Sequence, residues 1–120
     1  MRLSEPDTVD FLSIENVSGI LLLTLLDDCD WSDPRQHLLL LQAKINSYFN
    51  FIETGAVFRY FLETTGKKLE SSTPIAINVI AKYEPVDEGF RFLKHVSHVA
   101  RDAGVEFRFK TRLAEGAAPV

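Results

Sequence analysis

Two long segments of this chain carry their large apolar residues on one side only, and this feature most constrains the fold. In residues 34–53, spacing successive side chains by about 100° places six apolar residues within about a 100° arc. These residues are Leu38, Leu41, Ile45, Tyr48, Phe49 and Ile52. In residues 87–103, apolar and charged residues divide between two halves of the helical wheel in the same way. Because a helix with one apolar stripe must bury it against a second layer, both segments are expected to lie on one face of a single sheet.

Short signals mark where these helices begin and end. Asp33 stands before Pro34, with Gln36 three residues beyond the aspartate, which is typical of an N-cap followed by a proline in the first turn. Gly55 and Gly104 follow the two periodic segments and are expected to end the helices in the left-handed conformation.

Four segments have the pattern of β-strands. Residues 8–15 and 20–26 are separated by four turn-forming residues and are predicted to form a hairpin. The second of these strands is apolar on both faces, which places it inside the sheet. Residues 75–83 and 105–112 alternate between apolar and polar side chains, as half-buried strands do. Residues 56–62 suit a short strand, a helical turn or a loop equally well.

The predicted fold class is therefore α+β: a two-layer α/β sandwich of order β-β-α-(β)-β-α-β, with a mixed sheet and both helices on one face. The helix between the last two strands predicts a parallel crossover, with another strand expected between them. With 120 residues the chain fits one domain. We expect a flexible arm at residues 1–7, a domain at 8–113 and a flexible tail at 114–120.

Three stretches of the chain carry a family resemblance. They read VDFLSIENVSGILLLTLLDDCDW, HLLLLQAKINSYFNFIETG and KYEPVDEGFRFLKHV, and they cover most of residues 9–109. They resemble a family of small bacterial proteins, a domain of unknown function, and residues 56–72 match it least well. The resemblance implies a bacterial source and the same fold, and it carries over no catalytic residue.

The charges are unevenly distributed along the chain. Residues 1–60 hold four basic and nine acidic residues, whereas residues 61–120 hold nine and eight. General binding to a phosphate backbone needs a concentrated positive surface, so nucleic acid is an unlikely partner. One candidate basic face remains on the second helix: Arg91, Lys94, His95, His98 and Arg101. With the basic strand residues near the C-terminus, it would serve the alternative function of a weak nucleic-acid binder.

The acidic residues gather between the second strand and the first helix, at Asp27, Asp28, Asp30 and Asp33. The first part of this run imitates a calcium loop, but the glycine and the bidentate glutamate expected further along are missing. We therefore expect Asp33 to cap the helix and the others to be solvated charges near its positive end. An alternative function is a small enzyme or ligand-binding protein that uses this loop, from Asp27 to Asp33.

No residue in the sequence forms a recognisable catalytic or metal-binding motif. Cys29 lies between acidic residues, and their negative field disfavours the thiolate that a nucleophile needs. His95 and His98 have a spacing that can hold a metal, but neighbouring cations oppose one. We predict no cofactor, no metal and no catalytic residue.

The location follows from the cysteine count and the apolar runs. A single cysteine excludes an intramolecular disulfide and favours a reducing compartment. The longest apolar run, Ile20–Leu26, is far shorter than the roughly 20 residues of a membrane helix. The prediction is a cytoplasmic protein without a membrane partner.

Apolar residues beyond the two core stripes point to the function. They are Leu40, Phe51, Phe58, Tyr60 and Phe61, to which we add Trp31 as either a lid over the core or an exposed anchor. Exposed apolar patches are commonly interfaces, so the leading prediction is a non-catalytic protein-interaction or self-association module, with a homodimer or another protein as the partner. The alternative is that the segment after Gly55 folds back onto Leu40 and Phe51 within one chain.

Overall fold

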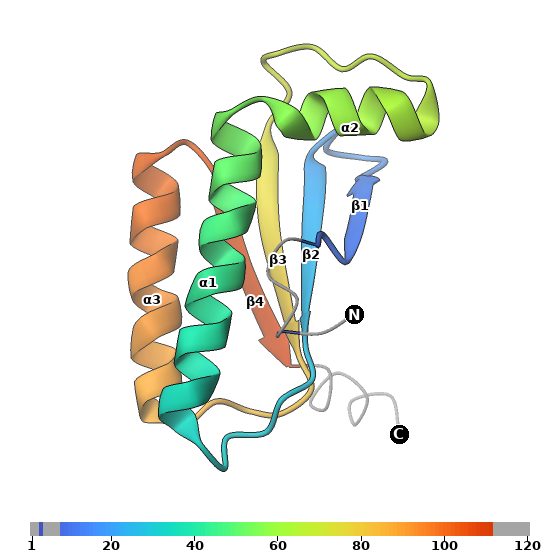
Figure 1. The fold of residues 1–120 in the computed structure, drawn as a ribbon. Helices are drawn as coiled ribbons and strands as arrows, with labels where there is room; N and C mark the ends of the chain where they lie inside the picture. Colours follow the sequence, from blue (N-terminus) through green and yellow to red (C-terminus); the bar gives the residue numbers. More distant parts are fainter. Residues whose placement is uncertain (1–2, 4–7, 112–120) are drawn as a thin grey trace.

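A computed structural model describes residue 3 and residues 8–111 of the chain (Figure 1). The elements follow in the order β1 (Phe11–Ile14), β2 (Leu21–Asp27), α1 (Pro34–Glu53), α2 (Ala56–Thr65), β3 (Ile75–Ala81), α3 (Asp87–Asp102) and β4 (Glu106–Thr111). Asp33 caps α1 by accepting the N–H of Gln36 at 3.2 Å, as its sequence pattern predicts. Gly55 and Gly104 both have a φ of 76°, which confirms the left-handed helix ends.

The four strands form one mixed sheet in the order β1-β2-β3-β4. β1 and β2 form the predicted antiparallel hairpin, whereas β2, β3 and β4 run parallel to one another. β4 pairs directly with β3, from Ala76↔Glu106 to Ala81↔Thr111, so the strand expected between them is absent. The segment that could have supplied such a strand, residues 56–62, belongs to α2 instead, so the optional strand of the predicted order is wrong.

α1 and α3 lie on the same face of the sheet (Figure 1), which confirms the two-layer α+β fold. Between the layers, leucines of β2 and β-branched residues of β3 meet the apolar sides of the helices. The buried centre consists of Leu21, Leu23, Leu25, Leu41, Ile45, Tyr48, Ile77, Val79, Leu93, Val96 and Ala100. In the part of the chain that the structure describes, no helix has the length and apolar character that crossing a membrane requires.

α2 crosses the end of α1, at the top of Figure 1. Gly55 turns the chain directly from α1 into α2, because its positive φ is a conformation that other residues rarely adopt. Val57 and Phe61, one helical turn apart, are buried on the inner side of α2. The sequence left open whether the segment after Gly55 forms an interface or folds back within the chain. For Val57 and Phe61 the structure shows the second alternative.

A buried polar network fastens the start of β1 to α1 and β2. Lys44 Nζ donates to both carboxylate oxygens of Asp10, at 2.9 and 3.1 Å, and both side chains are fully buried. The Leu26 N–H donates to the same carboxylate at 2.8 Å. The Asp10 N–H donates to the Tyr48 hydroxyl, which donates to the Thr24 carbonyl. Burial raises the pKa of Tyr48, so its hydroxyl keeps the proton that it donates.

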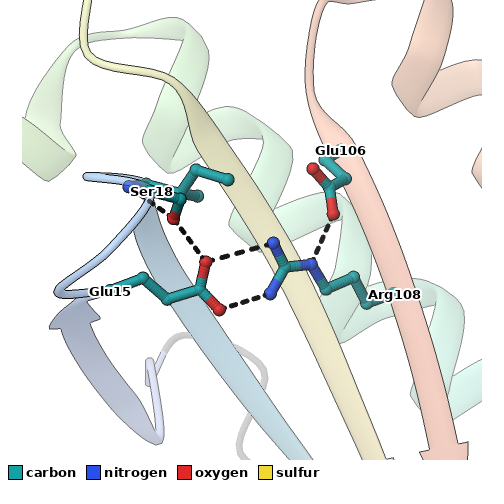
Figure 2. Close-up of polar contacts among 5 residues, drawn as sticks. Glu15, Ser18, Glu106 and Arg108 are labelled. Atoms are coloured by element: carbon teal, nitrogen blue, oxygen red, sulfur yellow. Dashed lines mark hydrogen bonds and ion pairs between the residues drawn. The ribbon is translucent and has the colours of Figure 1, made fainter.

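A second polar cluster lies on the sheet face opposite to the helices. The Arg108 guanidinium donates to both carboxylate oxygens of Glu15, at 2.7 and 3.2 Å, and also to Glu106. Ser18 donates to Glu15 at 2.6 Å. Figure 2 shows Arg108 reaching from β4 across β3 toward the hairpin turn. These bonds to the charged form lower the pKa of Glu15 from 4.5 to about 2, with the hydrogen bonds from Arg108 as the largest cause.

Two parts of the predicted domain organisation fall largely outside the described residues. The tail at 114–120 is not described, and of the arm at 1–7 only Leu3 is described. Leu3 is 1% exposed and belongs to the apolar core.

Replacing Lys44 by Met is expected to lower the free energy of unfolding by about 3–5 kcal/mol, because the Asp10 carboxylate is left buried without its cation. Urea denaturation followed by circular dichroism measures this change. Lys67→Met, at an exposed lysine, is the matched control and should change stability by less than about 0.5 kcal/mol. An equally small effect of Lys44→Met would contradict the importance of the buried pair.

The stabilisation from Glu15 is expected to depend on pH. Because folding lowers its pKa from 4.5 to about 2, the carboxylate stabilises the folded state fully above pH 4.5, and this contribution is lost as the pH falls toward about 2. The melting temperature of Glu15→Gln should therefore lie below that of the unchanged chain at neutral pH, and the difference should shrink through this window. A difference that stays constant between neutral pH and about pH 3 would rule out this linkage.

Candidate functional site

A groove opens where α1, α2 and the segment before β1 meet. Its volume is about 520 Å³. The described residues that line it are Thr8, Val9, Ser47, Asn50, Phe51, Thr54, Ala56 and Tyr60. Three α1 residues, Ser47, Asn50 and Phe51, and the C-cap residue Thr54 follow the spacing i, i+3, i+4 and i+7, so they form one face at the C-terminal end of that helix. We call this feature the groove.

The groove presents neutral hydrogen-bonding groups and aromatic rings. The described lining residues carry hydroxyls, one amide and apolar groups, and none of them is charged. The rings of Phe51 and Tyr60 meet edge to face, with centroids 5.9 Å apart, and connect α1 to α2. The volume falls within the range of about 300–1,000 Å³ found for ligand pockets.

Each wall of the groove is held in place by contacts deeper in the structure. The burial of Val57 and Phe61 holds α2 against the end of α1. The ion pair between Asp10 and Lys44 holds the neighbouring segment, which contains Thr8 and Val9, against α1. The groove is therefore formed by three separate segments, which the local sequence pattern does not connect.

The predicted interaction residues are distributed between the surface and the core. Tyr60 is 46% exposed and, with the half-buried Phe51, lines the groove. Leu40 and Phe58 are also half-buried and pack against the core. Phe61 is only 6% exposed, so its assignment to the interaction surface is wrong; it lies one helical turn after Val57 and faces the same core.

One exposed residue of α2 was missed by the sequence analysis. Leu62 is 43% exposed and lies on the outer side of the helix. The signal that could have identified it is the helical spacing of Val57 and Phe61, because placing these two residues inward turns Leu62 outward. That signal is usable only once residues 56–62 are known to be a helix and not a strand.

The acidic loop contains a buried ion pair. His37 Nε2 lies 2.6 Å from Asp27 Oδ2, and His37 Nδ1 lies 2.9 Å from the Asp30 carbonyl oxygen. Asp27 is 2% exposed, so the expectation that it is a solvated charge is wrong: His37 on α1 faces inward and pairs with it. Both ring nitrogens lie within hydrogen-bond distance of oxygen atoms, so both are engaged within the chain. The pair connects the end of β2 to α1.

Trp31 covers this ion pair. Its ring stacks on that of His37, with centroids 3.7 Å apart and an angle of 21° between the planes. A Cβ atom added to Gly89 would lie 2.7 Å from Trp31 Cη2, so the indole ring packs directly against the first turn of α3. Trp31 Nε1 is buried and has no hydrogen-bond partner among the residues that the structure describes. These contacts favour the lid over the exposed anchor.

The other groups of the acidic loop are also engaged. Ser32 donates to Asp30 through its hydroxyl and its backbone N–H, which lowers the pKa of Asp30. The Cys29 N–H donates to Asp27. Burial and then the neighbouring aspartates raise the pKa of the Cys29 thiol, which confirms the unfavourable field inferred from the sequence. Within residue 3 and residues 8–111, no three histidine, cysteine or acidic side chains are grouped so that they could hold a metal ion.

The predicted basic face occupies the outer side of α3. Its members, Arg91, Lys94, His95, His98 and Arg101, are all exposed. Arg108 does not join them, because it lies on the opposite face of the sheet and pairs with Glu15 and Glu106. The structure thus separates the basic residues of the C-terminal half into two groups.

The lid at Trp31 generates a stability prediction. Trp31→Ala should lower the free energy of unfolding by about 2 kcal/mol, because it removes the stacking on His37 and leaves a gap beside Gly89. Differential scanning calorimetry measures the loss, and Leu39→Ala, at an exposed residue of α1, serves as the control. A shift of no more than a few tenths of a degree in melting temperature for Trp31→Ala would show that the ring does not act as a lid.

Comparison with known proteins places the chain in a family without assigning an activity. The model of the Family of unknown function (DUF6572) matches residues 1–113, and the chain belongs to this family. No curated protein and no solved structure matches the chain.

Proposed function

We propose that this member of the Family of unknown function (DUF6572) is a non-catalytic protein-interaction module that associates with a second copy of itself through α2 and the groove. The observation that carries this proposal is the exposure of large apolar side chains on a helix that is otherwise anchored in the core. Tyr60 and Leu62 are 46% and 43% exposed, and Tyr60 forms part of the wall of the groove. Tyrosine is enriched among the residues that dominate binding energy at protein interfaces.

The chemistry of the groove supports a protein partner. Its hydroxyl and amide groups can form hydrogen bonds with a neutral surface or a backbone, and its aromatic residues offer apolar contact area. Interfaces commonly combine such apolar contact area with neutral hydrogen-bonding groups. The described lining of the groove has this composition.

The two alternative functions have less support. An enzyme that uses the acidic loop would need a free base, but both nitrogens of His37 are engaged and Trp31 covers the ring. A nucleic-acid binder would need the basic residues on one surface, but Arg108 lies on the opposite face of the sheet from α3 and pairs with two glutamates.

We also propose a bacterial source and a cytoplasmic location. The family resemblance supports the source, and the single half-buried cysteine supports a reducing compartment. Cell fractionation with an antibody against the chain tests the location: detection mainly in an oxidising compartment would contradict it.

Self-association is expected to depend on Tyr60. Analytical ultracentrifugation should show the mass rising from 13.6 kDa toward twice that value as the concentration increases. Tyr60→Ser should weaken association by about 2 kcal/mol, or roughly thirtyfold in the dissociation constant, because it removes an exposed aromatic residue from the interface.

The matched control is Tyr83→Ser. Tyr83 is 37% exposed but follows β3 and does not line the groove, so this change should leave association unaltered. A chain that keeps the single-chain mass at every concentration would contradict the proposed function, as would an equal effect of the two substitutions.

A further inference from the structure

We infer that the second copy docks with its α2 antiparallel to α2 of the first, about a two-fold axis near residue 61, and that Arg59 of each copy pairs with Glu63 of the other. This inference rests on the proposed function, since it specifies how the two copies meet. Three features of α2 support it: the composition of its exposed side, the symmetry of that side, and the position of its two charges along the helix.

The exposed side of α2 has charged residues at its centre and apolar residues at its flanks. Val57 and Phe61 mark the buried direction. At about 100° per residue, Arg59 and Glu63 lie about 40° apart and point away from that direction. Tyr60 and Leu62 lie on either side of them, and all four are exposed.

This arrangement is complementary to itself in one orientation. When two identical helices pack antiparallel about a two-fold axis at residue 61, residue 59 faces residue 63 of the other copy, and each flank of one helix faces the same flank of the other. Arg59 therefore meets the partner subunit's Glu63, while Tyr60 lies beside the partner subunit's Tyr60 on one flank and Leu62 beside the partner subunit's Leu62 on the other. Parallel packing would instead place each charge opposite its own copy, which is repulsive.

The helix dipole favours the same arrangement. Arg59 lies in the N-terminal half of α2, near the partial positive charge of the helix dipole. Glu63 lies in the last turn, near its partial negative charge, so each side chain is close to a partial charge of its own sign. In the antiparallel pair, Glu63 comes close to the positive half of the partner helix and Arg59 to the negative half. Association thus improves the electrostatic environment of both charges.

Within residue 3 and residues 8–111, neither Arg59 nor Glu63 forms an ion pair. They are four residues apart, but the arginine precedes the glutamate, and this order gives the weaker intrahelical pair. Both side chains can therefore pair with a second copy without breaking an ion pair to another described residue.

The groove lies beside the predicted contact. Tyr60 is at the same time a member of the exposed side of α2 and of the groove wall, where its ring meets the edge of Phe51. Pairing at residue 61 brings the partner subunit's Tyr60 to Tyr60, next to the groove. The apolar contacts thus continue from α2 toward α1.

Charge reversal tests this pairing. Arg59→Glu and Glu63→Arg each place like charges opposite one another at two positions, so each variant alone should dimerise at least about tenfold more weakly than the unchanged chain. An equimolar mixture of the two variants restores both ion pairs and should form a heterodimer, which native mass spectrometry distinguishes by its mass. The double variant, Arg59→Glu with Glu63→Arg, should also dimerise more tightly than either single variant.

Arg91→Glu is the matched control, because it reverses an exposed arginine on α3 and should leave dimerisation unchanged. Circular dichroism confirms that each variant is folded. If the single variants dimerise like the unchanged chain while Tyr60→Ser does not, this pairing is wrong and the proposed function stands. If the unchanged chain never dimerises, both are wrong. A mixture that stays monomeric, although the unchanged chain dimerises, would also overturn the pairing.

Discussion

The fold depends on the burial of two one-sided helices against a single four-stranded sheet. α1 and α3 cover one face of this sheet, and β1 lies beyond them at the edge (Figure 1). Two other contacts lie near that edge. α2 packs across the end of α1, and the Asp10–Lys44 pair holds the segment before β1 against α1. The groove is the space between α2, the end of α1 and the segment before β1. The position of the groove thus reflects the fact that two long helices do not extend over all four strands.

Two buried ion pairs fix α1 relative to the sheet. His37 pairs with Asp27 at the end of β2, and Lys44 pairs with Asp10 before β1. His37 and Lys44 are seven residues apart, so they lie on nearly the same side of α1, next to the apolar residues of the core. A buried charge is costly without its partner, so a shift of α1 by one residue would separate both pairs. The pairs therefore favour one register of helix on sheet, which the apolar contacts alone specify less strictly.

α2 connects this packing to the proposed function. Its inner side, with Val57 and Phe61, stabilises the single chain, whereas its outer side presents Tyr60 and Leu62 among opposite charges. The same short helix can serve both purposes because its two faces are separated by half a turn of the wheel. The loop that carries Trp31 and Cys29 is organised differently: its polar groups are satisfied within the chain or covered, and it is best understood as the closure of the opposite end of the core.

Local patterns were sufficient for the helices at 34–53 and 87–102, their caps, the hairpin and the fold class, because these features depend on residue spacing within one element. They could not determine the state of residues 56–65: their apolar residues suit a strand or a helix, and only packing against α1 selects the helix. They also could not reveal that Lys44 and His37 face inward, because the carboxylates that pair with these side chains lie at distant positions in the chain. The groove has the same origin, since its walls come from three segments that meet only in the folded chain. Residue spacing therefore determines the elements, and contacts between elements determine which polar side chains are buried and where a partner can bind.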